Sequence, residues 1–487
     1  MLRAFGLAAA LALAGPAVAA DYNLPEFGEP ADRSLPLSEE RELGAEVYRQ
    51  LKRRELLLAD RELESYVQML GQSLVDASPE ARGESFRFFV IRDASINAFA
   101  MPGGYIGVHT GLLKAAQSEA ELAAVLAHEI AHVTQRHIAR QMDATRGWDL
   151  ASAALLLAAI AAGGSDPDLA QAAIGLGMGM AYQRQVNFTR AHELEADRLG
   201  IQTLANAGYD SQGMEDFFRR LAAQSRLYGE GLPEILRTHP VSTTRMAEAA
   251  GRAEALPDGA SEQTGLFPLM RVRAELANID LAADKLRRFP AGLGEHPVAA
   301  RYGRAIALRA RGDLKAAQAA IDEALARSDT EAQAPLLQVE RARILYARKQ
   351  ADEARTLLRA VHKAHPGNHA ATLLLGEWLL AADRPADARQ LLLESEAFSA
   401  EVADTFFLLA RAASAMDEDA EAQYQLANYQ RARGDWAAAI RQLRAALAQR
   451  DWEDYARARL EGRLESMLAS APRSAIEELR RKPREPS

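Results

Sequence analysis

Residues 126–133 read Leu-Ala-His-Glu-Ile-Ala-His-Val, an HExxH motif inside an apolar run. Such a run predicts a buried helix, and residues four apart on a helix lie on the same face. His128 and His132 can therefore bind one metal ion, with Glu129 placed to reach a water beside it. Two histidines and a glutamate are costly to bury without a partner. The motif therefore predicts a zinc site with Glu129 as the general base.

A third protein ligand is expected for such a site, and residues 193–197, Glu-Leu-Glu-Ala-Asp, can supply it. Glu193 and Asp197 lie four apart on one face of a helix predicted over residues 191–207. One of them can ligate zinc while the other accepts a hydrogen bond from a ligating histidine. The alternative for this charge pattern is an ordinary acidic helix surface. Glu195 lies off that face and is expected to be solvated or paired with a basic residue.

Other histidines near the motif are not expected to be ligands. His137 follows His132 by five residues and so lies on a different helical face. His109 and His192 lack companions at metal-ligand spacing, which favours structural or solvated roles.

The residues around the motif predict mostly helix with a small sheet. Alternating apolar residues predict a strand over 85–92, and a second strand is predicted over 105–109, after a Pro-Gly-Gly turn. Either strand could pair with an extended substrate. A single helix is predicted over 119–141, carrying the HExxH motif.

The second half of the chain repeats. Small residues recur in successive predicted helices, and another alanine follows each of them twelve positions later: Ala305, Ala342, Gly376 and Ala410, then Ala317, Ala354, Ala388 and Ala422. A period of about 34 residues with small residues at fixed offsets is typical of tetratricopeptide helix pairs. We expect about four repeats with additional capping helices; a generic alanine-rich bundle is the alternative.

The fold class expected is mostly α: an HExxH metallopeptidase domain of the zincin type with a small β-sheet, followed by an α-helical tetratricopeptide solenoid. The expected domains are a signal peptide, the peptidase domain, the repeat domain and a basic tail, at residues 1–20, 21–260, 264–475 and 476–487.

Composition limits the class of function and the compartment. The chain has no cysteine and a formal charge of -9, which argues against a disulfide framework and against general nucleic-acid binding. One arginine, an apolar stretch and small residues up to Ala20 are typical of a signal peptide and predict export to the periplasm. No later segment reads as a transmembrane span.

The motifs in combination resemble the M48 family of zinc metallopeptidases. They are HEIAH at 128–132, ELEAD at 193–197, and NAFA at 97–100 before the Pro-Gly-Gly turn. The repeat half resembles the periplasmic BepA-like branch of that family. The resemblance covers nearly the whole chain after residue 20. A mild departure is Thr189, where the family usually has serine.

The resemblance implies roles for individual residues. It makes His128, His132 and Glu193 the ligands of one Zn²⁺ per chain, with Glu129 as base and Asp197 as the partner of a ligating histidine. Arg190 matches a basic residue that the family often places before the third ligand. In the BepA-like branch a histidine resembling His239 can occupy the fourth zinc position and hold the enzyme latent. A histidine before proline in a loop is otherwise ordinarily solvated.

Two functions follow from the resemblance. The first is a periplasmic zinc endopeptidase in outer-membrane protein quality control, which hydrolyses misfolded or stalled proteins. Its repeat half would contact the outer-membrane assembly machinery. The second is a chaperone or adaptor for outer-membrane protein assembly, with latent proteolysis.

Overall fold

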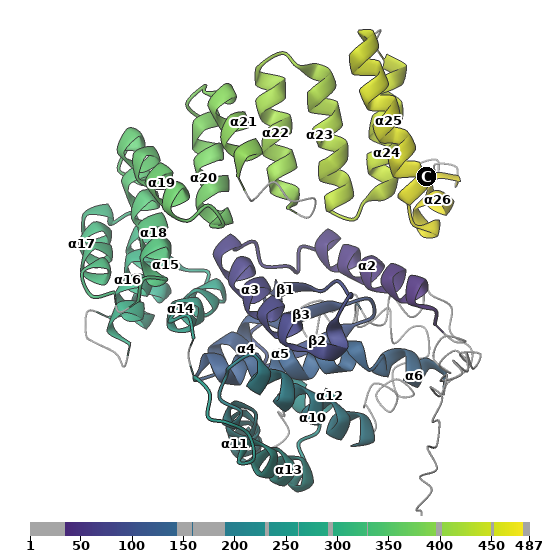
Figure 1. Ribbon diagram of the computed structural model, residues 1–487. Helices are drawn as coiled ribbons and strands as arrows, with labels where there is room; N and C mark the ends of the chain where they lie inside the picture. The colour runs from purple at the N-terminus through teal and green to yellow at the C-terminus, as the bar shows by residue number, and fades with distance from the viewer. Residues whose placement is uncertain are drawn as a thin grey trace, which may run out of the picture.

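The structure, a computed structural model, describes residues 35–143, 158, 190–228, 233–261, 263–290, 296–328, 330–395, 402–449 and 452–480. The predicted signal peptide lies outside the described residues. An N-terminal part combines helices with a small sheet, and an arc of helix pairs follows it (Figure 1). The expected fold class, mostly helical with a small sheet and a C-terminal helical repeat, is confirmed.

Within the part of the chain that the structure describes, the sheet has three strands in the order β1-β3-β2, with β1 at Arg87–Ile91, β2 at Ala98–Met101 and β3 at Tyr105–His109. Strand β3 pairs parallel to β1 and antiparallel to β2, so it lies in the centre. The expectation that the strand over residues 105–109 could pair with an extended substrate is therefore wrong, because both edges of β3 are already paired. The edges of the sheet are β1 and β2.

Alternating side chains give each face of the sheet its own apolar core. Phe88 and Val108 pack into the large core formed with α3 (Arg61–Ala77) and α5 (Glu119–Thr134). Phe89 and Phe99 pack on the other face with residues of α2 (Leu37–Arg53). The period of two in the sequence thus places a helix against each face.

The described residues of the N-terminal part hold seven further elements: η1 (Pro79–Ala81), α4 (Thr110–Ala115), α6 (His137–Asp143), α10 (Arg190–Asn206), α11 (Gln212–Tyr228), α12 (Glu234–Thr238) and α13 (Thr243–Ala253).

Helix α5 is buried along nearly its whole length and begins at an N-cap. The Ser118 side chain accepts a hydrogen bond from the Glu121 backbone N–H at 3.2 Å, which satisfies a donor that the helix leaves free. The helix ends at Thr134, and α6 begins at His137. The prediction of one helix over 119–141 was wrong at this point. Arg136 has φ 51°, a left-handed conformation that interrupts an α-helix.

Helix α10 packs against α5, and one glycine of α10 lies directly at the contact. A Cβ built on Gly200 would lie 3.1 Å from the backbone nitrogen of His128 and 3.2 Å from its Cα. A side chain at this position would be tightly packed against the first histidine of the motif, so its neighbours would have to shift by a few tenths of an ångström.

The repeat half begins with α14 (Phe267–Ala277) and α15 (Ala282–Arg288). Four helix pairs follow: α16 (Pro297–Arg311) with α17 (Leu314–Leu325), α18 (Gln333–Ala347) with α19 (Ala351–Ala364), α20 (His369–Leu380) with α21 (Pro385–Glu394), and α22 (Ala403–Ala415) with α23 (Asp419–Ala432). The chain continues through α24 (Trp436–Gln449), α25 (Asp454–Ser470) and α26 (Arg473–Arg480). All eight small residues of the repeat pattern lie in these four pairs and are buried. Four repeats with additional helices match the expectation.

The arc curves over α2 and α3 (Figure 1). Arg61 at the start of α3 contacts Glu377 of α20 at 2.8 Å and Asp404 of α22 at 2.7 Å. Near the C-terminus, the Arg473 backbone N–H donates to the Glu42 carboxylate of α2 at 3.2 Å. The N-terminal part therefore touches the arc at points far apart along it.

A buried charge network joins the two parts near Glu62. Arg273 of α14 contacts Asp60 at 2.7 Å and Glu62 at 2.9 Å, and Arg343 of α18 also pairs with Glu62. The apolar core is continuous here too, since it includes Leu63 of α3 together with residues of α14, α16 and α18.

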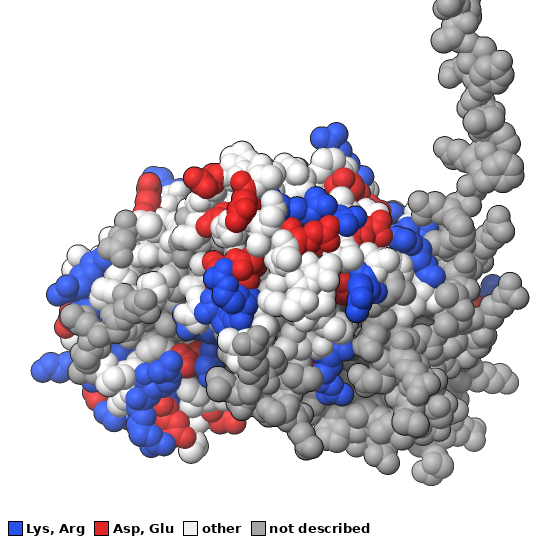
Figure 2. All heavy atoms as spheres, turned by 90° about the horizontal axis from the view of Figure 1, so that it is seen from below, with Lys and Arg blue, Asp and Glu red and all other residues white. Residues whose placement is uncertain are grey.

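The face of the molecule turned away from the arc carries charges of both signs. Lysine and arginine are interspersed with aspartate and glutamate over its described part (Figure 2). Among the described helices, none has the length and apolarity needed to cross a bilayer.

The Glu62 network predicts a pH-dependent contribution to stability. Burial raises the pKa of Glu62, but Arg273 and Arg343 outweigh it and lower the pKa from 4.5 to about 2. The contribution, about 3 kcal/mol, is present above the unfolded value of 4.5 and is lost as the pH falls toward 2. Glu62→Gln should lower the free energy of urea unfolding at pH 7, and its difference from wild type should shrink below about pH 4.5.

The matched control is Glu323→Gln, which breaks the 2.9 Å pair with Arg301 where the glutamate side chain is 62% exposed. It should change stability little. A Glu62→Gln difference that is absent at pH 7, or constant with pH, would contradict the assignment.

Candidate metal centre

Four buried side chains from three helices converge on one point. His128 and His132 come from α5, Glu193 from α10, and His239 from the end of α12, and one ligand atom of each lies within 4.8 Å of the others. Their residues are between 2% and 6% exposed. His239 is held by its own backbone N–H, which donates to the Ile235 carbonyl at 2.8 Å.

The distances between these atoms fit a tetrahedral metal site. The Nε2 atoms of His128 and His132 are 2.9 Å apart, and the Nδ1 atom of His239 lies 3.4 Å from the former. Glu193 Oε1 lies 3.0 Å from His239 Nδ1 and 3.6 Å from His132 Nε2. Ligand atoms about 2.1 Å from one ion at tetrahedral angles stand about 3.4 Å apart. Three imidazoles and one carboxylate are also ligands that suit zinc.

Glu129 lies beside this group with its carboxylate unsatisfied. The residue is 1% exposed, and neither oxygen accepts a hydrogen bond from the described residues. The His239 Nε2 atom is 3.6 Å from Oε1. A buried carboxylate with no hydrogen bond is costly, so a further polar group belongs at this position.

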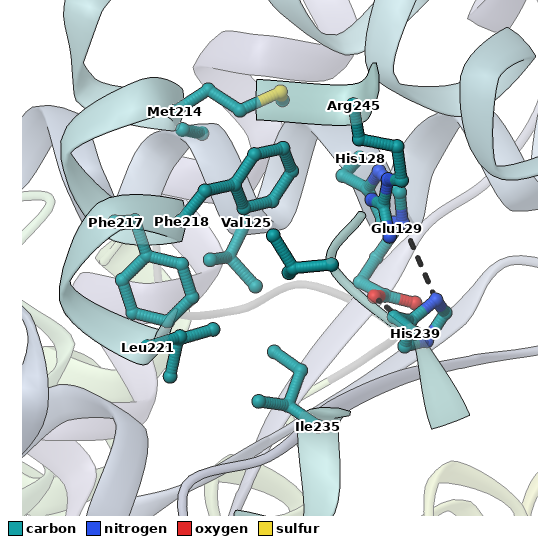
Figure 3. A pocket seen from close by; sticks show the side chains of 12 residues that line it. Val125, His128, Glu129, Met214, Phe217, Phe218, Leu221, Ile235, His239 and Arg245 are labelled. Carbon is teal, nitrogen blue, oxygen red and sulfur yellow. Dashed lines mark hydrogen bonds and ion pairs between the residues drawn. The ribbon is translucent and has the colours of Figure 1, made fainter. Parts of the chain in front are cut away.

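A cavity of about 20 Å³ adjoins Glu129, which is room for one water. Its polar end is formed by His128, Glu129, His239 and Arg245, and its apolar wall comes largely from α11, including Phe217, Phe218 and Leu221 (Figure 3). The apolar wall lowers the local dielectric and strengthens charge interactions at the polar end.

Asp197 and Arg245 stand behind the first histidine. The Nδ1 atom of His128 lies 2.9 Å from Asp197 Oδ1. Arg245 of α13 donates to both Asp197 oxygens, at 2.6 and 2.7 Å, and also contacts Glu193 Oε2 at 2.7 Å. This fork fixes the carboxylate that orients the imidazole.

The charges of the group are mutually dependent. Burial raises the pKa of Glu193, but His239, His128 and Arg245 outweigh it and hold the pKa below 4.5. Burial likewise raises the pKa of Asp197, and Arg245 and His128 reverse that effect. Burial lowers the pKa of His239, yet Glu193 and Glu129 raise it overall. The charged forms of Glu193 and Asp197 are therefore favoured by the cationic groups beside them.

The pKa of His132 changes in the opposite direction. Burial lowers it, and the neighbouring His128 and His239 lower it further. A neutral imidazole is the form that binds a metal ion.

His132 has a second partner on the side away from the group. Its Nδ1 atom lies 2.8 Å from His137 Nδ1, and His137 Nε2 lies 3.1 Å from Glu195 Oε2. The expected basic partner of Glu195 is also present, since Arg140 donates to it at 3.1 Å.

The structure brings together most of the residues singled out in the sequence. His128, Glu129, His132, Glu193 and His239 form one group, with Asp197 behind it. Arg190 is exposed at the first residue of α10 and has no hydrogen bond or ion pair with the described site residues. The loop histidine, His239, is buried instead of solvated.

Sequence reasoning missed Arg245 and the contact of His137 with His132. Arg245 lies in the first turn of α13, where the only local signal is its Ser242 N-cap. The spacing of five residues predicts a different helical face for His137, and this differs from the structure because the chain changes direction at Arg136.

Known families match both parts of the chain. Residues 61–253 match the model of peptidase family M48, and residues 345–398 match a tetratricopeptide repeat model. The first match spans the sheet, α5 and the helices that carry Glu193, His239 and Arg245.

The chain spans about half the length of the bacterial curated relatives that it matches. A putative beta-barrel assembly-enhancing protease of Vibrio cholerae is 41% identical over 244 residues, 50% of each chain. The beta-barrel assembly-enhancing protease of Escherichia coli K12 is 35% identical over 292 residues, 58% of each chain. The mitochondrial metalloendopeptidase OMA1 of Arabidopsis thaliana is 33% identical over 183 residues, covering 37% of this chain and 35% of that protein. The chain therefore contains a peptidase family M48 domain followed by tetratricopeptide repeats.

Proposed function

We propose that this protein is a zinc-dependent endopeptidase that acts on polypeptides during assembly of outer-membrane β-barrel proteins. The observation that carries the proposal is the convergence of His128, His132, Glu193 and His239 beside the unsatisfied Glu129 carboxylate. The names of the bacterial relatives support the substrate class.

The residues would divide the chemistry as follows. A bound zinc ion would lower the pKa of a water and polarise the substrate carbonyl. Glu129 would take the proton of the attacking water and deliver it to the leaving amine. Asp197, fixed by Arg245, would keep His128 in the tautomer that presents Nε2.

His239 would hold the resting protein latent. Its Nδ1 atom lies 3.4 Å from His128 Nε2 and 3.0 Å from Glu193 Oε1, so it would fill the position that a catalytic zinc leaves open. The cavity beside Glu129, about 20 Å³, is also too small for a peptide. Cleavage would therefore require His239 to leave the group.

An extended substrate would pair with edge strand β2 (Ala98–Met101) once the site opens. Strand β2 packs against α5. The backbone just before β2 also contacts α12, the helix that precedes His239, because the Ile235 N–H donates to the Ile96 carbonyl at 3.1 Å. Substrate pairing at this edge would use main-chain hydrogen bonds.

The repeat half would recruit substrates or the assembly machinery. A cavity of about 1070 Å³ lies between the arc and α2 and α3, with Arg61, Glu64 and Tyr48 on one side and residues of α20 and α22 on the other. A concave helical arc suits extended peptides or a partner's helix. A periplasmic location, with residues 1–20 as leader, belongs to this proposal.

A chaperone or adaptor role with latent proteolysis is the second candidate. The observation that favours it is the contrast between the closed metal site and the large cavity under the arc. Client binding that survives the loss of cleavage, together with full rescue of the cellular phenotype by an inactive variant, would make this role the dominant one.

Glu129→Gln should lower cleavage of a urea-unfolded outer-membrane barrel protein by at least about a hundredfold, because the amide cannot take a proton. The zinc content should stay at the wild-type level, since the four ligand side chains are unchanged. Cleavage assays and zinc analysis by mass spectrometry measure both effects.

Glu248→Gln is the matched control, on the outer surface of α13 where this glutamate pairs with Arg198 at 2.6 Å. It should cleave like wild type. Full activity in Glu129→Gln would exclude Glu129 as the base.

His239→Ala should raise the cleavage rate and keep zinc, because His128, His132 and Glu193 remain as ligands and the fourth position opens. His296→Ala, an exposed histidine before α16, is the control and should leave the rate unchanged. A rate that is equal or lower in His239→Ala with zinc retained would exclude His239 as the residue that keeps the protein latent.

Arg245→Met should destabilise the metal-free protein by about 3 kcal/mol, because Asp197 and Glu193 would lose a buried cationic partner. Added zinc should recover part of the loss, since the ion replaces the missing positive charge. Urea unfolding with and without zinc measures both.

Arg252→Met on the same helix is the control, because this arginine is 43% exposed and its only described ion pair is with Glu248, at 3.5 Å. Equal stability of the two variants without metal would contradict the proposed role of Arg245.

A further inference from the structure

Each α5 histidine of the metal group has a partner at its other ring nitrogen, but the two partners differ in kind. His128 meets the Asp197 carboxylate directly, at 2.9 Å. His132 instead meets another imidazole, with 2.8 Å between its Nδ1 atom and that of His137. The two rings cross at 73° with their centres 4.8 Å apart.

The contact continues to a carboxylate. His137 is 0% exposed, and its Nε2 atom lies 3.1 Å from Glu195 Oε2. Arg140 of α6 donates to the same oxygen at 3.1 Å, which fixes the carboxylate from the other side. His192 stacks on the His137 ring, with centres 4.4 Å apart and planes at 14°. His137 thus lies between two helices, with both of its nitrogens engaged.

The backbone break after α5 makes this contact. In an unbroken helix, five residues rotate the chain by about 500°, so His137 would face about 140° away from His132. The left-handed residue Arg136 redirects the chain instead. Its side chain is held by Glu40 and by the Leu35 carbonyl, each at 2.7 Å, and these contacts offset an unfavourable conformation.

The proton positions follow from metal binding. A His132 ring that gives Nε2 to a metal keeps its hydrogen on Nδ1, so Nδ1 donates and His137 Nδ1 accepts. The hydrogen of His137 is then on Nε2, which donates to Glu195. One tautomer at each ring therefore satisfies both contacts, from His132 to His137 and from His137 to Glu195.

We propose that His137 and Glu195 are positioning residues that orient the metal ligand His132 through this imidazole–imidazole–carboxylate chain. The inference rests on the proposed function, because it requires a metal in the group. It assigns to a buried histidine and a half-exposed glutamate the role that Asp197 fills for His128. Partners of this kind commonly change metal affinity by ten- to a hundredfold.

The test is zinc affinity of the full chain, measured by competition with a fluorescent chelator. His137→Phe keeps the ring volume and removes both nitrogens, so its affinity should fall about ten- to a hundredfold. Glu195→Ala should also weaken binding, and Glu195→Gln should restore part of the loss, because its amide oxygen still accepts from His137. Glu195 is 37% exposed at its side chain, so these variants leave the core intact.

Two controls separate orientation from packing. His192→Ala removes the ring stacked on His137 and leaves the contacts of His137 with His132 and Glu195 in place, so zinc affinity should not change. His109→Phe makes the same substitution at another 0% exposed histidine, one that contacts Ser95 at 2.8 Å, and should likewise keep the affinity. Thermal unfolding of each metal-free variant shows that the fold is retained.

The outcomes are distinct. Weaker binding in His137→Phe and Glu195→Ala, with normal binding in both controls, supports the inference. Wild-type affinity in His137→Phe, or an equal loss in His192→Ala, overturns it and leaves the proposed function standing. A wild-type chain that binds no zinc overturns the proposed function, and this inference with it.

Discussion

The close crossing of α5 and α10 is the contact on which the candidate metal centre depends. Gly200 faces the backbone of His128, where even a Cβ would lie only 3.1 Å from the backbone nitrogen, so the two helices pack closely at the first histidine of the motif. Glu193, Asp197, Gly200 and Leu204 recur at helical spacing and form one buried stripe on α10. The N-terminal part of that stripe places the two carboxylates beside the imidazoles, and its C-terminal part packs in the apolar core.

Most of the buried charges of the site are paired with one another, while the Glu129 carboxylate accepts no hydrogen bond from the described residues. Glu193 and Asp197 share Arg245, and His239 lies between Glu193 and Glu129. Unpaired carboxylates at this depth would be unstable, so the cationic partners are a structural requirement. The same arrangement brings His239 into the group and leaves a cavity with room for little more than a water.

The sequence predicted those parts of the site that local periodicity determines. His128 and His132 are four apart on a helix, as are Glu193 and Asp197, and these spacings fix their faces before any tertiary contact forms. The repeat pairs were predictable for the same reason, since buried small residues recur at fixed offsets. Residues positioned by a change of chain direction were not predictable. Arg136 interrupts a helix with a left-handed conformation that is usual only for glycine. Arg245 reaches the site from a helix that carries no motif of its own.

The central claim is that His128, His132, Glu193 and His239 bind one zinc ion in the resting protein. X-ray absorption at the zinc edge, on full-length protein with measured metal content, tests it most directly. The account predicts one zinc per chain in a four-coordinate site, with scattering from three imidazoles. A chain without stoichiometric zinc, or a site with only two imidazoles, would contradict it.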